Sequence, residues 1–163
     1  MAFIEVDNFV NRFELKTTEL SEQKLIAYIE RYSDDYLKEM LGLELFDLFM
    51  QGVEDEDPIY LALRNKFTYQ NNCEIINSKG VEDMLLGIVY FYFARDLKVQ
   101  QTTVAGKMTK NENSNPLQSN SWLFSRYNDS IATYKAIQQY CIYNRATYPT
   151  FKGINKKYAY LTN

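Results

Sequence analysis

Residues 78–100 read SKGVEDMLLGIVYFYFARDLKVQ, and this stretch decides the fold. Its apolar side chains cover nearly every face of a helix, as expected for a helix at the centre of a bundle. They are Met84, Leu85, Ile88, Val89, Phe91, Tyr92 and Phe93. A buried strand is the competing interpretation of IVYFYF, residues 88–93. The flanking sequences EDMLLG and ARDLK favour a helix.

Amphipathic helices are predicted before and after this segment. Residues 21–41 carry apolar side chains at helical spacing, with Ser21 as a suitable N-cap. Gly42 should stop or kink that helix before a short helical piece over 43–50. The same spacing predicts a last helix over 118–146.

The middle of the chain is expected to hold a linker and a short helix. The acidic run over 54–57 precedes Pro58, and Asp57 is a fitting cap for a helix over 58–67. Asparagines and a glycine then predict a looser connection over 71–80.

Together these patterns predict an all-α fold, a small bundle of three to four helices. An extended N-terminal arm is expected over 1–20, with Phe3, Phe9 and Phe13 as apolar anchors. The helical domain should span 21–147 and include a long polar loop, 101–116, between the last two long helices. An extended C-terminal arm follows over 148–163.

The polar loop TTVAGKMTKNENSNP, residues 102–116, is a candidate contact site. A loop of this length inside a compact domain is usually functional or disordered. It buries little apolar surface, so we expect it to take its structure against another molecule. The candidate contact residues are Thr102, Thr103, Val104, Lys107, Lys110, Asn113 and Ser114.

Composition argues against enzyme chemistry. The chain has no histidine, so the usual general base is missing, and its two cysteines, Cys73 and Cys141, form no CxxC pair. The acidic run over 54–57 lacks the ligand spacing and the glycine of a calcium loop. We therefore expect no enzyme activity, no catalytic residue, no metal and no cofactor.

The same sequence predicts a soluble protein made in a cytoplasm, without a membrane partner. The N-terminus has acids within its apolar run and no basic region, unlike a signal peptide. The longest apolar run, 84–94, is shorter than the ~20 residues that cross a bilayer.

Charge is unevenly distributed along the chain. Residues 1–60 carry 15 acids and 5 bases, a net charge of −10, whereas residues 61–163 carry 6 acids and 13 bases, a net charge of +7. Such polarity concerns partners and self-association rather than fold.

The C-terminal arm is the second candidate contact site. A terminal arm is expected to have little core of its own to reach, and tyrosine is favoured where one side is apolar and the other wet. Deleting the arm is therefore expected to leave a folded monomer that no longer joins its assembly. The candidate docking residues are Tyr148, Phe151, Lys152, Lys156, Lys157 and Tyr158.

Residues 32–46, YSDDYLKEMLGLELF, resemble the first helix and kink of the helical head-to-tail connector proteins of tailed bacteriophages. KGV at 79–81, TTVAGK at 102–107 and NENS at 111–114 carry the same resemblance. It is closest to the connectors of phages that infect gut Bacteroidetes, including the crAss-like group, and it spans residues 20–145.

The resemblance implies a structural protein without a catalytic site or cofactor. Its copies, typically about twelve, would form a ring beneath the portal and join head to tail. The implied partners are other copies, the portal protein, the next connector or tail protein and, transiently, genomic DNA in the channel. The implied location is the neck of the virion. In such a ring, we expect an acidic helix, with Glu30, Asp34 and Glu39, to face either a basic flank of a neighbouring copy or the DNA channel.

Two alternatives stay open. One is a small helical interaction module or regulator that acts as a dimer. The other is a helical nucleic-acid-binding protein, against which the net charge of −3 argues.

Overall fold

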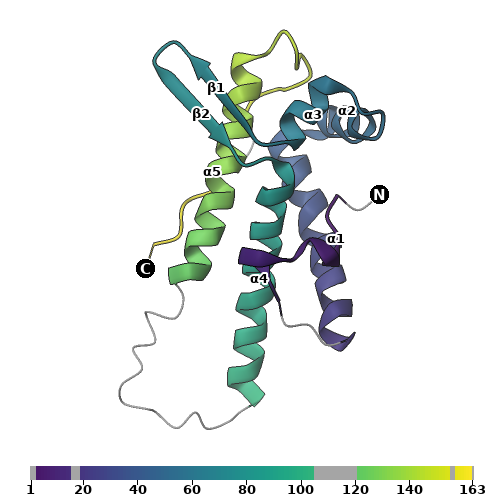
Figure 1. Cartoon of the computed structure of the whole chain (residues 1–163), viewed down its shortest axis with the longest axis vertical. Helices are drawn as coiled ribbons and strands as arrows, with labels where there is room; N and C mark the ends of the chain where they lie inside the picture. The colour runs from purple at the N-terminus through teal and green to yellow at the C-terminus, as the bar shows by residue number, and fades with distance from the viewer. Residues whose placement is uncertain (1–2, 16–18, 105–120, 155–156, 163) are drawn as a thin grey trace.

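The computed structural model describes residues 3–15, 19–104, 121–154 and 157–162 (Figure 1). These residues form five α-helices and a two-stranded antiparallel sheet, so the all-α prediction is wrong and the fold is mixed. The α-helices are α1 (Glu19–Leu41), α2 (Leu43–Glu54), α3 (Pro58–Arg64), α4 (Val81–Val104) and α5 (Ser121–Tyr143), the strands are β1 (Phe67–Asn71) and β2 (Glu74–Ser78), and two 3-10 turns, η1 (Val6–Asn8) and η2 (Asn11–Phe13), precede them.

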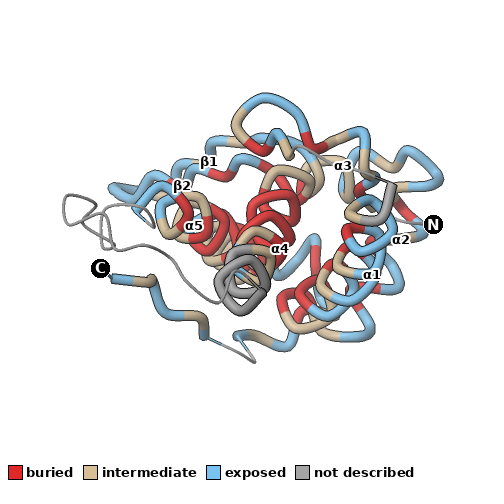
Figure 2. The backbone as a smooth tube through the Cα atoms, turned by 90° about the horizontal axis from the view of Figure 1, so that it is seen from below, coloured by how far each residue is buried: buried red, intermediate tan, exposed pale blue. Residues whose placement is uncertain are grey.

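Helix α4 is the centre of the molecule. It lies between α1 and α5 and runs antiparallel to both (Figure 1). Residues 84–91 of α4 are all buried, and the buried positions of the three long helices face one another (Figure 2). The prediction of a central buried helix is confirmed, and IVYFYF is helical rather than extended.

Helix α5 approaches α4 closely at Gly87. A Cβ atom at this position would collide with Ser130 Oγ and lie 3.2 Å from the carbonyl oxygen of Arg126. The predicted apolar stripe of α5 is buried as expected: Leu123, Tyr127, Ile131, Tyr134, Ile137 and Cys141.

The turns around α2 follow the sequence signals. Gly42 adopts a positive φ of 77° between α1 and α2, a conformation that glycine adopts without steric cost. The Asp57 carboxylate accepts a hydrogen bond of 2.9 Å from the backbone N–H of Ile59 and so caps α3. Both predictions are confirmed, although α2 is longer than the predicted 43–50.

The predicted looser connection over 71–80 is instead half of a β-hairpin. Tyr69 pairs with Ile76 in its centre, and Asn72 and Cys73 form the two-residue turn. Asn72 has a φ of 53°, which asparagine tolerates better than most residues. The hairpin packs against α5, where the Phe67 ring lies 4.6 Å from the Tyr140 ring.

Candidate functional site

Two oppositely charged flanks lie on opposite sides of the bundle. The acidic flank is residues 43–57, α2 and the turn after it, which carry six carboxylates and no lysine or arginine. The basic flank is residues 121–154 and 157–162, α5 and the C-terminal segment, which carry five bases and one acid. Both views place α2 on one side of the molecule and α5 with the C-terminal end on the other (Figures 1 and 2). The two flanks meet where Lys152 forms an ion pair with Glu44 at the start of α2.

Most carboxylates of the acidic flank are unpaired. Among the described residues no lysine or arginine forms an ion pair with Asp47, Glu54, Asp55 or Glu56. Two large apolar side chains are exposed on the same helix, Leu43 at 67% and Leu48 at 41%. This combination is typical of a surface that contacts another protein.

Several cations of the basic flank lie on aromatic rings rather than on carboxylates. The Lys135 ammonium is 3.8 Å from the centre of the Tyr160 ring, and the Arg126 guanidinium lies 4.7 Å from the Tyr90 ring. Ring contacts hold a cation in place without neutralising its charge. These two cations therefore keep their positive charge, whereas Lys152 is offset by Glu44 of α2.

The C-terminal arm does reach the core of its own chain, so that expectation is wrong. Tyr148 is 1% exposed and Phe151 is 3% exposed. The Tyr148 hydroxyl donates a 2.8 Å hydrogen bond to the carbonyl oxygen of Ile59 in α3. Their burial comes from tertiary packing of the arm on α3 and α5, which the spacing of aromatic residues alone does not reveal. Docking through these two side chains would first require the arm to detach.

The other candidates of the arm divide into engaged and exposed residues. Lys152 forms a 2.6 Å ion pair with Glu44 at the start of α2, and Lys157 is exposed. The Tyr158 hydroxyl donates to a Glu39 carboxylate, and its ring stacks 4.8 Å from the Tyr36 ring. Lys156 lies outside the described residues.

Tyr158 joins α1 to α5 through a buried group of tyrosines. Its ring also meets Tyr134 edge-on at 5.2 Å, while Tyr36 shares a 2.9 Å hydrogen bond between hydroxyls with Tyr92. Burial first, and then the hydrogen bond shared with Tyr92, raises the pKa of Tyr36 far above its ordinary value. Tyr36 therefore stays neutral at physiological pH, and the tyrosine group holds the C-terminal segment across the two helices.

The three acidic candidates of α1 do not form one outward surface. Glu30 is exposed, Asp34 forms a 3.0 Å ion pair with Lys38, and Glu39 is engaged by Tyr158. Arg31 is also exposed on this helix. The outward face of α1 is therefore mixed in charge, and the strongly acidic surface belongs to α2.

The loop candidates fall almost entirely beyond the described positions. The backbone of Thr102, Thr103 and Val104 forms the last turn of α4, so this helix ends later than the predicted Gln100. What their side chains contact lies outside the described residues, as do Lys107, Lys110, Asn113 and Ser114.

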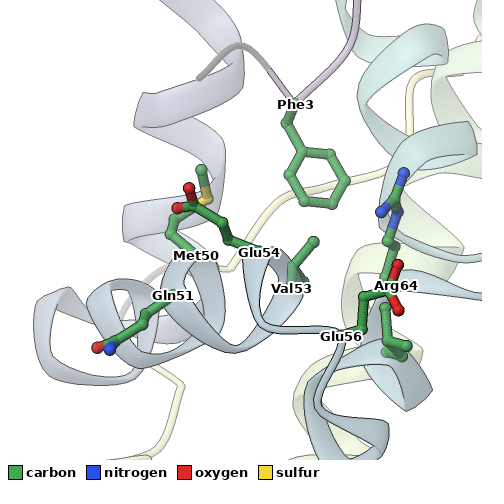
Figure 3. A pocket seen from close by; sticks show the side chains of 8 residues that line it. Phe3, Met50, Gln51, Val53, Glu54, Glu56 and Arg64 are labelled. Atoms are coloured by element: carbon green, nitrogen blue, oxygen red, sulfur yellow. The ribbon is translucent and has the colours of Figure 1, made fainter.

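A groove opens between the N-terminal segment, α2 and α3 (Figure 3). It has a volume of about 550 Å³, and Phe3, Met50, Val53 and Leu61 supply its apolar lining. The Phe3 ring lies on Phe49 at 5.5 Å and under the Arg64 guanidinium at 5.6 Å. The carboxylates of Glu54 and Glu56, which belong to the acidic flank, also line the groove.

The groove could not be predicted from the sequence because Phe3 is distant in the chain from the rest of its lining, which lies within residues 50–64. Met50, Val53 and Leu61 have the spacing of core residues, and nothing in the linear pattern brings Phe3 to them. The available signal was the Asp57–Pro58 cap, which reverses the chain and sets α3 beside α2.

An ion-pair cluster fastens the N-terminal segment to the bundle. The Arg12 guanidinium bonds Asp83 of α4 and, at 3.1 Å, Asp129 of α5, while the Lys79 ammonium reaches Asp129 at 2.6 Å. Ile4, Phe9 and Phe13 are buried beside it, so Phe9 and Phe13 are anchors as predicted.

Comparison with known proteins returned no relatives. No protein-family model, no curated protein and no solved structure matches this chain. Among the residues that the structure describes, none of the helices is long and apolar enough to cross a bilayer. Within the same residues, no group of three cysteine, aspartate or glutamate side chains is arranged to hold a metal ion.

Replacing Asp129 by asparagine is expected to remove an acid-sensitive part of the stability. Burial by itself would raise the pKa of Asp129, but hydrogen bonds from Lys79 and Arg12 hold it below its ordinary value. A lowered folded-state pKa stabilises above the unfolded pKa, and that contribution disappears as pH falls through the folded pKa. Because the partners are about 40% exposed, we expect a loss of at most about 1 kcal/mol at pH 7.

Urea unfolding of Asp129→Asn and the parent chain at pH 7 and near pH 2 measures this effect. The two chains should differ at neutral pH and converge in acid. Asp35→Asn, at an exposed position of α1, is the matched control and should change neither value. An equal difference at both pH values would contradict the ionic explanation.

Proposed function

We propose that this chain is a structural virion protein of a tailed bacteriophage, a connector whose copies form a ring below the portal and join head to tail. The observation that carries the proposal is the placement of the acidic and basic flanks on opposite sides of one subunit. In a closed ring, one flank of each subunit meets a different flank of the next. Opposite charges would then attract at every contact.

The same charge placement argues against a two-fold dimer through either flank. A two-fold interface brings one surface against its own copy, so carboxylates would face carboxylates. Like charges directly opposed at an interface cost several kcal/mol. In head-to-tail association, each acidic flank contacts the basic flank of the next copy, so both flanks face opposite charge.

The resemblance to phage connectors supports the same assignment. Its main segment, residues 32–46, forms the end of α1, the bend at Gly42 and the start of α2, and residues 79–81 lead into α4. The proposed partners are the portal protein, the next connector or tail protein, and genomic DNA passing transiently through the channel. The proposed role is structural, without an enzymatic step or a cofactor.

Light scattering on the purified chain during size-exclusion chromatography tests the ring, and mass spectrometry of purified virions tests the location. We expect an assembly of many times the 19.2 kDa subunit, alone or with portal protein, and peptides of this chain in virions. A stable dimer that is missing from virions would contradict the proposal and support the dimeric regulator.

A further inference from the structure

The groove beside α2 and α3 is suited to bind a peptide segment that carries a lysine together with aromatic or aliphatic side chains. Its lining is apolar at Phe3, Met50 and Val53, and it carries two carboxylates, Glu54 and Glu56, against one cation, Arg64, which lies over the Phe3 ring. No ion pair with a described lysine or arginine neutralises either carboxylate. A lysine side chain suits such a place because its stem is apolar and its head is charged.

The C-terminal segment of the chain presents that chemistry outward. Ile154 is 41% exposed, Tyr160 is 49% exposed, and Lys157 is exposed between them. No acid occurs after Asp129 in the sequence, so nothing in this segment would be repelled by the carboxylates of the groove. Ile154 and Lys157 also line a second hollow, of about 380 Å³, beside Lys135 on α5.

This segment and the groove cannot meet within one subunit. Tyr158 holds the segment on α1 and α5, and Asn128 of α5 bonds the backbone of Leu161 twice, at 2.7 and 2.8 Å. The groove lies at the opposite flank, beside α2 (Figures 1 and 3). A second copy placed head to tail would bring its exposed segment to the groove without releasing these contacts.

We propose that the groove receives the outward side chains of the C-terminal segment, Ile154, Lys157 and Tyr160, from the adjacent copy. The inference rests on the head-to-tail association of the proposed function and names the contact that makes it. Lys157 pairs with Glu54 and Glu56, while apolar contact with Met50 and Val53 provides burial. The charges fix register, because a shifted segment would lose the ion pair.

Exchange of the two charges tests this contact. Glu56→Lys and Lys157→Glu are each expected to weaken self-association at least about tenfold, measured as the concentration of half-dissociation by analytical ultracentrifugation. The chain that carries both substitutions should recover to within about threefold of the parent, because the ion pair is restored with reversed polarity. Circular dichroism of each variant confirms that it is folded.

The matched control is Asp47→Lys combined with Lys157→Glu. It makes the same charge change on α2 but outside the groove, so it should not recover. A second measurement uses Val53→Cys and Tyr160→Cys together in a Cys73→Ser chain, which should form disulfide-linked multimers on mild oxidation.

The outcomes separate this inference from the proposed function. One outcome is a ring for which the double charge exchange fails to restore self-association and no disulfide-linked multimers form. That result overturns the groove contact but not the ring. Recovery and linkage within a dimer support the groove contact and overturn the ring. A chain that stays monomeric under all conditions overturns both.

Discussion

Replacing Tyr148 by alanine is expected to lower the free energy of unfolding by about 3–5 kcal/mol, the range for a fully buried aromatic side chain. The ring is 1% exposed and lies 6.0 Å from the Tyr140 ring and 6.5 Å from the Tyr60 ring. Its loss would leave a cavity between α3 and α5 and a carbonyl group of Ile59 without its donor. Urea unfolding followed by circular dichroism measures the change.

Two further substitutions show whether the loss of stability comes from the buried ring of Tyr148 or from any change in the C-terminal segment. Tyr148→Phe keeps the ring and removes the hydroxyl, so it should cost about 1 kcal/mol. Tyr160→Ala lies in the same C-terminal segment but is 49% exposed, and should cost no more than about 0.5 kcal/mol. If Tyr148→Ala proved as mild as Tyr160→Ala, the arm would not belong to the core.

This result changes how the C-terminal arm should be tested. Deleting residues 148–163 removes two core side chains, Tyr148 and Phe151, together with the Tyr158 contacts on α1 and α5. A failure of such a chain to join virions would therefore report loss of stability as much as loss of docking. Substitutions at Lys157 and Tyr160 test docking with the core intact.

The helices could be predicted from sequence because local signals and the final environment agree. Residues 84–93 are apolar on nearly every face, and the buried centre of the bundle is where such a helix is stable. Gly42 and Asp57 act within a few residues of themselves, through a positive φ and a cap. Signals of that kind need no knowledge of the tertiary structure.

The hairpin was missed because its strands are short and its outward face is polar except for Ile75. Thr68 and Asn77 are opposite one another and hydrogen-bonded at 2.9 Å on the exposed side, so the segment resembles a loop in composition. The weak alternation in FTYQN and the two-residue turn at Asn72 were the available signals. In a single sequence, neither signal for a hairpin is stronger than the asparagines, which predict a loop.

The candidate surfaces were only partly predictable for a similar reason. Counting charges separated an acidic half of the chain from a basic half, but it could not assign the acids to a face. Folding pairs Asp34 with Lys38 and engages Glu39 with Tyr158, which leaves α2 as the acidic surface. The Asp34–Lys38 pair has i,i+4 spacing within α1, which a charge count ignores, and the Glu39 contact depends on which segments become neighbours.

Raising the ionic strength from ~0.01 M to ~0.15 M is expected to weaken self-association about tenfold or more, because the screening length falls from ~30 Å to ~8 Å. Neutralising the acidic flank should reproduce the effect without salt. The chain with Asp47→Asn, Glu54→Gln, Asp55→Asn and Glu56→Gln is expected to associate weakly already at low ionic strength and to respond little to added salt. Sedimentation velocity at both ionic strengths measures each case.

The control for this prediction decides which acidic surface faces the neighbour. Glu30→Gln with Asp34→Asn removes two carboxylates from α1, where Lys38 and Arg31 offset part of the acidic charge. Because that face is mixed, the double substitution should leave both the strength of association and its response to salt nearly unchanged. If it weakened assembly as much as the change on α2, the contact would lie on α1, and the acidic flank would be free to face the DNA channel. An assembly indifferent to salt would show that apolar burial alone holds the copies together, and the opposite charges of the two flanks would then have no part in their order.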